Sequence, residues 1–401
     1  MSGLVLKNVN KIYPGGQQSV KDFSLEIRDR EFLILVGPAG CGKSALLRMI
    51  GGLDEISSGS LFIDGKDMTD ADPKDRNIAM LFKNSVLYPG MTVEDNLSFA
   101  LRMGKMAQGE IDRRIREISG YLKLSDILDK KPEELTGEET YRALLGRAMM
   151  RRPGILLLDS TIADLEESLQ KVMRKEFKDI HKKMDMTVIY VTDNQETALA
   201  LGTRMVVMNE GSICQDGTPE ELAAHPANCF VGGVVGRSPM NFFLMKVFSE
   251  GGRIGLQGAS GRMLVPEAVG AVLENNGYVG KEVITGVRAE DVCLSRASED
   301  GQDGHFSARF QSMTGDGTML RFQAEDADGI CQAEGERIFG KMKRYTSLWT
   351  LKRSICLIRI RKKTFCKGMI SQQSGAGCGA GLFFCGKIQN FSFLFCDFAL
   401  K

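Results

Sequence analysis

The sequence lacks several features that would place it in a specialised class of protein. Charge of neither sign is in excess, because 52 basic and 51 acidic residues among 401 give a formal net charge of +1. We therefore expect no nucleic acid as a partner. No apolar run approaches the roughly 18 residues of a membrane-spanning helix, and residues 1–7 lack the basic-then-apolar pattern of a secretory signal peptide. These absences predict a cytosolic protein, in which the ten cysteines are not expected to form disulfides.

What the chain does contain is a glycine-rich loop between an apolar run, residues 32–36, and a helix-forming stretch. Residues 37–44 follow the pattern Gly-x-x-x-x-Gly-Lys-Ser of a phosphate-binding loop. Its glycines let the backbone fold tightly, so that N–H groups point at phosphate oxygens beside a helix N-terminus. We expect Lys43 to reach the β- and γ-phosphates of ATP and Ser44 to bind Mg²⁺. The predicted nucleotide contacts are Gly37, Pro38, Ala39, Gly40, Cys41, Gly42, Lys43, Ser44 and Ala45.

Two further residues complete the predicted nucleotide site. Tyr13 lies in a turn before the loop, where an aromatic ring could stack on the base or could merely line the rim. Residues 154–159 are four apolar residues between Gly154 and Asp159. Such a strand places an acid beside Mg²⁺ in phosphate-loop enzymes, so Asp159 is the second predicted metal ligand.

The chain length predicts two or three domains. In residues 1–236, strands alternate with helices, which indicates an α/β fold with a mostly parallel, helix-covered sheet. A helical insert is expected at about 88–150, where apolar residues recur at helical spacing: Ile111, Ile115, Ile118 and Leu122. Short strands between glycines then predict a small β-barrel-like domain at 237–340.

Together these motifs resemble the ATP-binding subunit of ABC importers, specifically the carbohydrate (maltose-type) branch. The resemblance implies an ABC ATPase domain followed by a β domain of the OB or TOBE type. It covers residues 1 to about 340. The matching segments are Walker A at 37–44, the contact with the membrane subunit at 87–97, the signature at 135–139 and Walker B at 156–159, followed by three segments typical of this branch at 217–222, 238–242 and 286–291.

The resemblance implies a dimer of cassettes, homomeric or heteromeric, that clamps two ATP molecules. Each ATP would lie between the Walker A loop of one chain and the signature of the other. Closure of the dimer would drive membrane permease subunits, to which an extracytoplasmic solute-binding protein delivers the solute. The chain would therefore be peripheral on the inner face of the membrane. The signature residues are Leu135, Thr136, Gly137, Glu138 and Glu139, and the helix after them is expected over 140–150.

The sequence departs from the family pattern around the γ-phosphate. Lys83 replaces the Q-loop glutamine, and an ammonium cannot ligate Mg²⁺. Ser160 replaces the glutamate expected as general base, and Asp193 replaces the switch histidine. In the signature, Glu138 and Glu139 put two carboxylates at a helix start that should attract phosphate. Hydrolysis is therefore expected to be weak or absent, unless Asn194 or Glu196 serves as the base.

Three interpretations of the whole chain follow. It is a working ATPase subunit of a carbohydrate importer, a partner cassette that binds ATP without turnover, or the product of a decaying gene.

The tail, residues 341–401, has basic residues, cysteines and phenylalanines without period. One permitted set of codons for residues 352–366, shifted by two bases, gives Glu-Ile-His-Leu-Phe-Asp-Pro-Asp-Thr-Glu-Lys-Asn-Leu-Leu. That peptide resembles the family's C-terminal strand. The tail is therefore either the result of a frameshift near residues 335–350 or a genuine divergent segment. With a frameshift, the β domain would lack its closing strand and expose an edge.

Overall fold

The structure is a computed structural model of the chain. It describes residues 3–160, 167–236, 238–259, 261–289, 292–295, 305–313, 319–324, 327–332, 355–360, 365–366, 383–388 and 391–396. The chain divides into two compact units, Met1–Pro219 and Glu220–Lys401, whereas the sequence placed the boundary after residue 236.

The centre of the first unit is a six-stranded sheet in the order β10-β9-β3-β8-β7-β6. Strands β9, β3, β8, β7 and β6 run parallel, and β10 pairs antiparallel with β9. This confirms the predicted mostly parallel sheet. The strands are β3 (Phe32–Val36), β6 (Ile78–Leu81), β7 (Ile155–Asp159), β8 (Thr187–Thr192), β9 (Arg204–Asn209) and β10 (Ser212–Gly217).

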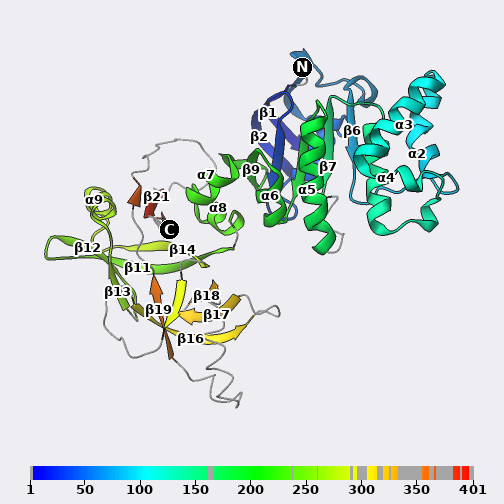
Figure 1. Cartoon of the computed structure of the whole chain (residues 1–401). Helices are drawn as coiled ribbons and strands as arrows, with labels where there is room; N and C mark the ends of the chain where they lie inside the picture. Colours follow the sequence, from blue (N-terminus) through cyan, green and yellow to red (C-terminus); the bar gives the residue numbers. More distant parts are fainter. Residues whose placement is uncertain are drawn as a thin grey trace, which may run out of the picture. The chain divides into compact units, whose positions relative to one another are not determined.

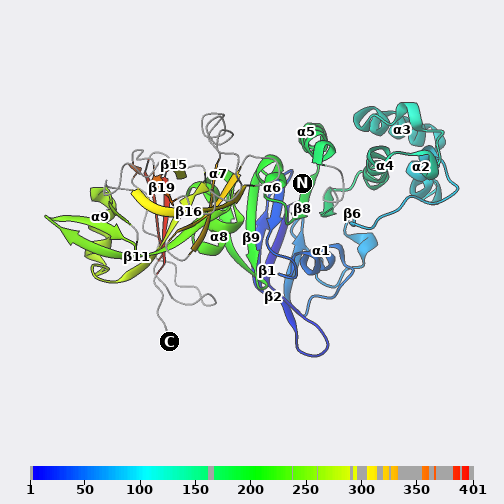
Figure 2. The same ribbon diagram turned by 90° about the horizontal axis from the view of Figure 1, so that it is seen from below.

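A second, antiparallel sheet of four strands lies beside the first, in the order β2-β1-β4-β5. Helix α1 (Lys43–Gly51) shares one hydrophobic core with both sheets and contacts β2 (Figure 2). Asp64 and Gly65 form a tight hairpin between β4 and β5, and both residues have positive φ, as the turn requires. The strands are β1 (Leu4–Ile12), β2 (Gln18–Ile27), β4 (Ser58–Ile63) and β5 (Lys66–Asp67).

The predicted helical insert consists of α2 (Val93–Met103), α3 (Gln108–Leu122) and α4 (Gly137–Met149). These helices contact one another and gather beyond β6 (Figure 1). The four apolar residues at helical spacing on α3 are all buried, as predicted. Two more helices, α5 (Glu167–Lys183) and α6 (Gln195–Leu201), pack together. Among the described residues, no helix combines the length and the apolarity needed to cross a bilayer.

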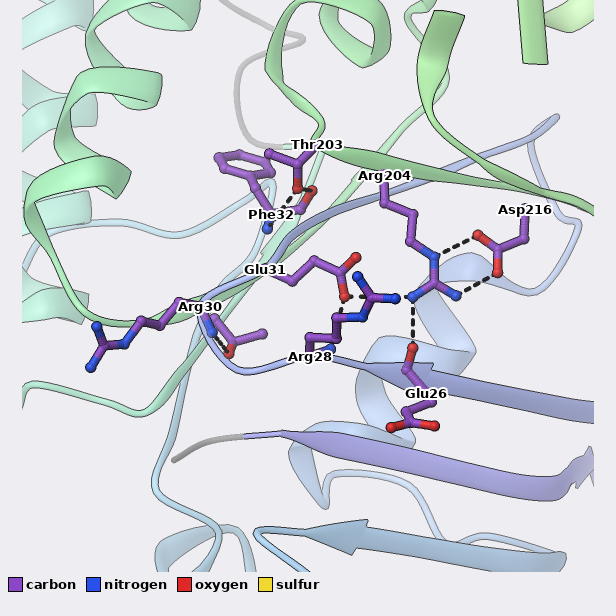
Figure 3. Close-up of polar contacts among 9 residues, drawn as sticks. Glu26, Arg28, Arg30, Glu31, Phe32, Thr203, Arg204 and Asp216 are labelled. Atoms are coloured by element: carbon purple, nitrogen blue, oxygen red, sulfur yellow. Dashed lines mark hydrogen bonds and ion pairs between the residues drawn. The ribbon is translucent and has the colours of Figure 1, made fainter. Parts of the chain in front are cut away.

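Polar contacts fix the amino end of β3, opposite the phosphate loop (Figure 3). The Thr203 hydroxyl lies 3.3 Å from the Phe32 amide nitrogen and 3.0 Å from the Phe32 carbonyl oxygen. Arg204 pairs with Asp216 of β10 and donates to the Glu26 carbonyl oxygen at 2.7 Å. The Thr203 contacts tie the start of β3 to the segment before β9, and Arg204 ties the start of β9 to β2 and β10.

The second unit is built on antiparallel strands with one hydrophobic core of its own. Its helices are α7 (Pro219–Ala224), α8 (Cys229–Val234) and α9 (Glu267–Asn275). The buried Arg288 donates to the carbonyl oxygens of Ala223, Gly232 and Ser238, which ties both α7 and α8 to the sheet. The first strands are β11 (Met240–Glu250), β12 (Arg253–Gln257), β13 (Gly261–Leu264), β14 (Glu282–Arg288) and β15 (Val292–Ser295).

The expected open edge of this β domain is not what the structure shows. Strand β19, from the tail, pairs with both β15 and β16, and β22 pairs with β14. The reason is that the tail retains short apolar runs that can extend a sheet. The remaining strands are β16 (His305–Met313), β17 (Met319–Ala324), β18 (Ala327–Gln332), β19 (Ile355–Ile360), β20 (Phe365–Cys366), β21 (Phe383–Ile388) and β22 (Phe391–Cys396).

The position of β19 sharpens the frameshift hypothesis into a test. Strand β19 begins at Ile355, whose codon overlaps the shifted histidine codon at the start of His-Leu-Phe-Asp. Restoring the shifted frame within codons 335–350 should therefore place a family-type strand between β15 and β16, where β19 lies. We expect the thermal midpoint and the solubility to rise. The matched control is a synonymously recoded gene for the present chain. An unchanged thermal midpoint on restoration would favour the genuine tail.

Candidate nucleotide-binding site

The topology brings the predicted site residues to one edge of the parallel sheet. The register aligns Val36 with Thr192, Asp159 with Val191, and Leu81 with Leu158. The carboxyl ends of β3, β6, β7 and β8 therefore meet at the same edge, which is where ligands bind in open α/β sheets. The segments that leave these ends carry the phosphate loop, Lys83, Ser160 and Asp193.

Glycine is required in the phosphate loop because the backbone passes very close to two neighbouring strands. A Cβ atom on Gly37 would lie 2.2 Å from the carbonyl oxygen of Met208 on β9. A Cβ atom on Gly42 would lie 2.1 Å from the carbonyl oxygen of Ser19 on β2, and Gly42 has a φ of +103°. The N-terminus of α1 directly follows Gly42. Glycine thus permits the tight loop that aims backbone N–H groups at an anion.

Lys43 is buried and its ammonium group folds back over the loop. It donates to the carbonyl oxygen of Gly37 at 2.8 Å and to that of Pro38 at 2.7 Å, and it lies 3.5 Å from the Cys41 sulfur. The positive charge is therefore held inside the ring of backbone that the phosphates of a nucleotide would enter. Pro38, Ala39 and Gly40 form the exposed outer arc of the loop.

The two predicted metal ligands lie together. The Ser44 hydroxyl donates to an oxygen of Asp159 at 3.2 Å, which joins the start of α1 to the end of β7. Hydroxyl and carboxylate oxygens suit Mg²⁺, which usually takes one or two protein ligands and its other ligands from phosphate and water. Over the described ranges there is no group of three or more His, Cys, Asp or Glu side chains that could hold a metal alone. The pair fits a cation that arrives with a nucleotide.

Tyr13 lies in the turn between β1 and β2 and is fixed from two sides. Its hydroxyl donates to an oxygen of Asp54 at 3.2 Å, and the Lys11 ammonium lies over its ring, 5.0 Å from the ring centroid. Burial and the neighbouring Asp54 carboxylate raise the pKa of Tyr13. Arg48 of α1 forms two hydrogen bonds with Asp54, each of 3.0 Å, and lowers the pKa of that carboxyl group.

The structure describes all three substituted positions around the predicted γ-phosphate. Ser160 has a φ of +49°, and its amide and hydroxyl groups both donate to the Val191 carbonyl oxygen. Asp193 and Lys83 are exposed in the turns that follow β8 and β6. A serine hydroxyl that donates to a backbone carbonyl offers no basic group to a water molecule.

Asn194 and Glu196, considered as replacement bases, have other contacts. The Asn194 side-chain oxygen accepts from the Thr197 amide and caps α6, while Glu196 pairs with Arg174 at 3.2 Å. An amide is not a base at neutral pH. Neither contact favours a catalytic role.

The signature segment begins α4 three residues earlier than the sequence predicted. Thr136 is the N-cap, and Thr136 and Glu139 form a reciprocal capping box, so the helix starts at Gly137. The pattern Thr-x-x-Glu is the signal that could have predicted this start. The Glu139 carboxylate accepts a hydrogen bond from the Thr136 amide, and this bond and the neighbouring Lys130 ammonium lower the pKa of Glu139.

The two carboxylates of the signature are not unpaired charges, which corrects the strength of the expected repulsion. Glu139 pairs with Lys130 at 3.0 Å, and Glu138 pairs with Arg142 at 2.6 Å. Arg142 is 7% exposed and also binds Glu176 at 2.8 Å, and Glu176 pairs with Lys123 as well. The carboxylates of these three glutamates thus pair with three cations, Lys123, Lys130 and Arg142. The Glu138 side chain points along α4 toward Arg142.

Comparison with known proteins identifies the family. The pattern of the ABC transporter family matches residues 20–163. The oligosaccharides import ATP-binding protein MsmX of Bacillus subtilis (strain 168) is 44% identical over 292 residues, which are 73% of this chain and 79% of that protein. The trehalose/maltose import ATP-binding protein MalK of Thermococcus litoralis is 43% identical over 298 residues, 73% of this chain and 79% of that protein. The chain belongs to the ATP-binding subunits of carbohydrate ABC importers.

The structural comparison agrees on the fold of the ABC ATPase. The structure of cbiO1 from Clostridium perfringens, described as part of the ABC transporter complex cbiONQ, aligns with a TM-score of 0.53. The alignment covers 55% of this chain and 90% of cbiO1 at 24% identity, which establishes the fold alone.

Sequence reasoning missed the residues that hold the others in place. Lys11 and Asp54 contact Tyr13, while Lys130 and Arg142 pair with the signature carboxylates. The spacing of four between Glu138 and Arg142 was a readable signal on a helix. No pattern in the sequence links Asp54 to Tyr13, because 41 residues separate them.

The charge network predicts that Arg142 matters to stability far more than Glu138 does. Arg142→Met should lower the free energy of unfolding by about 3 kcal/mol, because it leaves carboxylates without their buried partner. Glu138→Gln should cost less than about 1 kcal/mol, since Glu138 is 41% exposed. Denaturant titration of both variants measures the difference. Equal losses would show that the network does not support the helical insert.

Proposed function

We propose that this chain is the Mg-ATP-binding subunit of a carbohydrate importer in which hydrolysis is weak or absent. The observation that carries the proposal is a contrast between two groups of residues at the carboxyl edge of the parallel sheet. The loop with Lys43, Ser44 and Asp159 retains groups that suit phosphate and Mg²⁺. The positions of the expected base and switch residue, Ser160 and Asp193, do not retain their chemistry.

Binding is assigned to the phosphate loop, to Ser44 and Asp159 beside it, and to Tyr13 in the turn between β1 and β2. The loop amides and the N-terminus of α1 would hold the β-phosphate, with the charge of Lys43 beside it. Ser44 and Asp159 would bind the cation, and Tyr13 would stack on the base. When bound, Mg²⁺ would neutralise charge on the phosphates. ATP and Mg²⁺ are general to the ABC ATPase family to which the chain belongs.

The loss of hydrolysis follows from side-chain chemistry. Without a positioned base at Ser160, the attack of water loses about 10²–10⁴ in rate. Asp193 cannot donate to the γ-phosphate as a histidine can, and its charge would repel that group. Lys83 offers no oxygen to Mg²⁺. These three effects act on the same reacting centre, so they reinforce one another.

In the proposed dimer, the signature would hinder closure through the size of the Glu138 side chain as well as through its charge. Glycine at position 138 would let a phosphate approach the helix start closely, whereas Glu138 adds a side chain there. Its pairing with Arg142 screens the negative charge but does not remove the side chain. In a dimer, homomeric or with another cassette, the site that receives this signature would therefore close poorly.

The partner surface proposed for the permease subunits is the segment 87–97. Asn96 is fully buried; its side-chain oxygen accepts from the Tyr88 amide, and its side-chain NH₂ donates to three carbonyl oxygens. This fixes the segment, while Tyr88 within it and Val86 just before it expose apolar surface. A rigid segment with exposed apolar side chains suits a membrane-subunit contact. The chain would then be peripheral on the inner face of the membrane, with a solute-binding protein as an indirect partner.

The second candidate function is a partner cassette that binds ATP without turnover and regulates an intact cassette. The balanced charges around Glu138, Glu139 and Arg142 favour it, because the altered signature is accommodated by the fold. A third origin, a decaying gene, is compatible with the tail.

The binding proposal predicts a Lys43-dependent affinity. The unaltered chain should bind Mg-ATP, and Lys43→Ala should abolish binding because the loop loses its only side-chain cation. Isothermal calorimetry at millimolar ATP measures this. Lys74→Ala is the matched control, since Lys74 is exposed and pairs with Asp72 at 3.1 Å. Absence of heat with the unaltered chain would refute the binding proposal.

The hydrolysis proposal predicts strongly non-additive repair. The single changes Lys83→Gln, Ser160→Glu and Asp193→His should each recover little turnover. The combination with Glu138→Gly and Glu139→Gln should raise the rate by about 100-fold or more. Steady-state phosphate release measures the rate, and Lys43→Ala in the repaired chain controls for contaminating ATPase. Robust Lys43-dependent turnover in the unaltered chain would show that another residue acts as the base.

A further inference from the structure

The contacts of Asp54 connect the predicted base-binding tyrosine to the helix of the phosphate loop. Asp54 follows α1, and its amide group donates to the Arg48 carbonyl oxygen at 3.3 Å. Its carboxylate accepts two hydrogen bonds of 3.0 Å from the Arg48 guanidinium, in the fork geometry that holds a carboxylate most firmly. The Tyr13 hydroxyl donates to the same carboxylate at 3.2 Å.

A second contact restrains the same ring from one side. The Lys11 ammonium lies over the Tyr13 ring and also donates to the Glu55 carbonyl oxygen at 2.8 Å. Lys11 is 8% exposed, so this cation has little freedom to move away. One face of the ring therefore carries a fixed positive charge, and a planar ligand can stack only on the other face.

Helix α1 has only nine residues, Lys43–Gly51, and the phosphate loop ends at its first turn. Arg48 lies on this same helix, and the turn at Gly52 holds Asp54 against its end. The helix thus bears phosphate-binding groups at one end and the support for Tyr13 at the other. A ring mounted in this way keeps its distance from the phosphate loop.

We propose that Asp54, held by Arg48, is a positioning residue that orients the Tyr13 ring to stack on the base of a nucleoside triphosphate whose phosphates occupy the loop. This inference rests on the proposed function, because it assumes that ATP binds at the loop. Asp54 does not touch the nucleotide, and it contributes to affinity by reducing the freedom that Tyr13 loses on binding.

The test separates the base from the phosphates by using two probes, Mg-ATP and inorganic tripolyphosphate with Mg²⁺. Asp54→Ala should weaken ATP binding roughly fivefold, the size expected for one net hydrogen bond. Its affinity for tripolyphosphate should stay that of the unaltered chain, because tripolyphosphate has no base. Asp72→Ala, which removes an exposed aspartate paired with Lys74, is the matched control.

Tyr13→Phe supplies the same test without altering the carboxylate, and it serves where Asp54→Ala does not fold. It retains the ring and removes only the hydroxyl, so it should show the same selective loss. The double variant should lose no more than either single variant, because both changes remove one bond. Calorimetry gives the affinities, and the thermal midpoint confirms that each variant is folded.

The outcomes distinguish the inference from the proposal beneath it. An equal loss for ATP and tripolyphosphate, or no loss for ATP, would overturn the role of Asp54 while ATP binding by the unaltered chain stands. If the unaltered chain binds neither probe, the proposed function fails and the inference fails with it.

Discussion

The candidate site depends on how closely the backbone after β3 can approach its neighbours. The loop passes within contact of the Met208 carbonyl on β9 and the Ser19 carbonyl on β2, and only glycine at positions 37 and 42 leaves room. Any other residue would push the loop off both strands and move the start of α1. Because Ser44 meets Asp159 across that start, a displaced helix would also separate the two proposed metal ligands. One steric constraint therefore governs the proposed anion site, the proposed cation site and, through α1, the support of Tyr13.

The altered signature shows how a fold can absorb charge without recovering chemistry. Glu138 and Glu139 would be costly at a helix start if they stood alone, yet each has a cation within hydrogen-bonding distance. Glu139 even stabilises the helix, because it completes the capping box with Thr136. Acidic residues in a first helical turn also suit the helix dipole. The capping box engages the backbone N–H groups of Thr136 and Glu139. In the proposed dimer these two amides would not be available to a phosphate, so helix stability and phosphate binding would make opposite demands on this turn.

The extent to which the sequence predicted the structure depends on the range of the interactions involved. The phosphate loop, the strands of the parallel sheet and the buried stripe of α3 were predictable because each is set by local pattern. The start of α4 differs from the prediction although its capping box is a local signal, because that box lies inside the segment that resembles the family signature. The separate four-stranded sheet, the Asp54 contact and the pairing of β19 were not predictable, because they join residues far apart in the chain. Sequence periodicity describes a strand but does not name its neighbour.

The groups proposed for nucleotide binding and the groups proposed to be lost from hydrolysis lie on different elements of this chain. The groups proposed for phosphate and Mg²⁺ lie in the loop after β3, at the start of α1 and at the end of β7. These segments are joined by close backbone packing and by the bond between Ser44 and Asp159. The groups proposed to be lost, Lys83, Ser160 and Asp193, lie in the turns after β6, β7 and β8. Residues in such turns carry little of the core, so they can change without cost to the fold. Substitutions that end catalysis would therefore leave the nucleotide cradle intact, and that cradle would retain a function wherever occupancy by ATP, and not turnover, is what a partner detects.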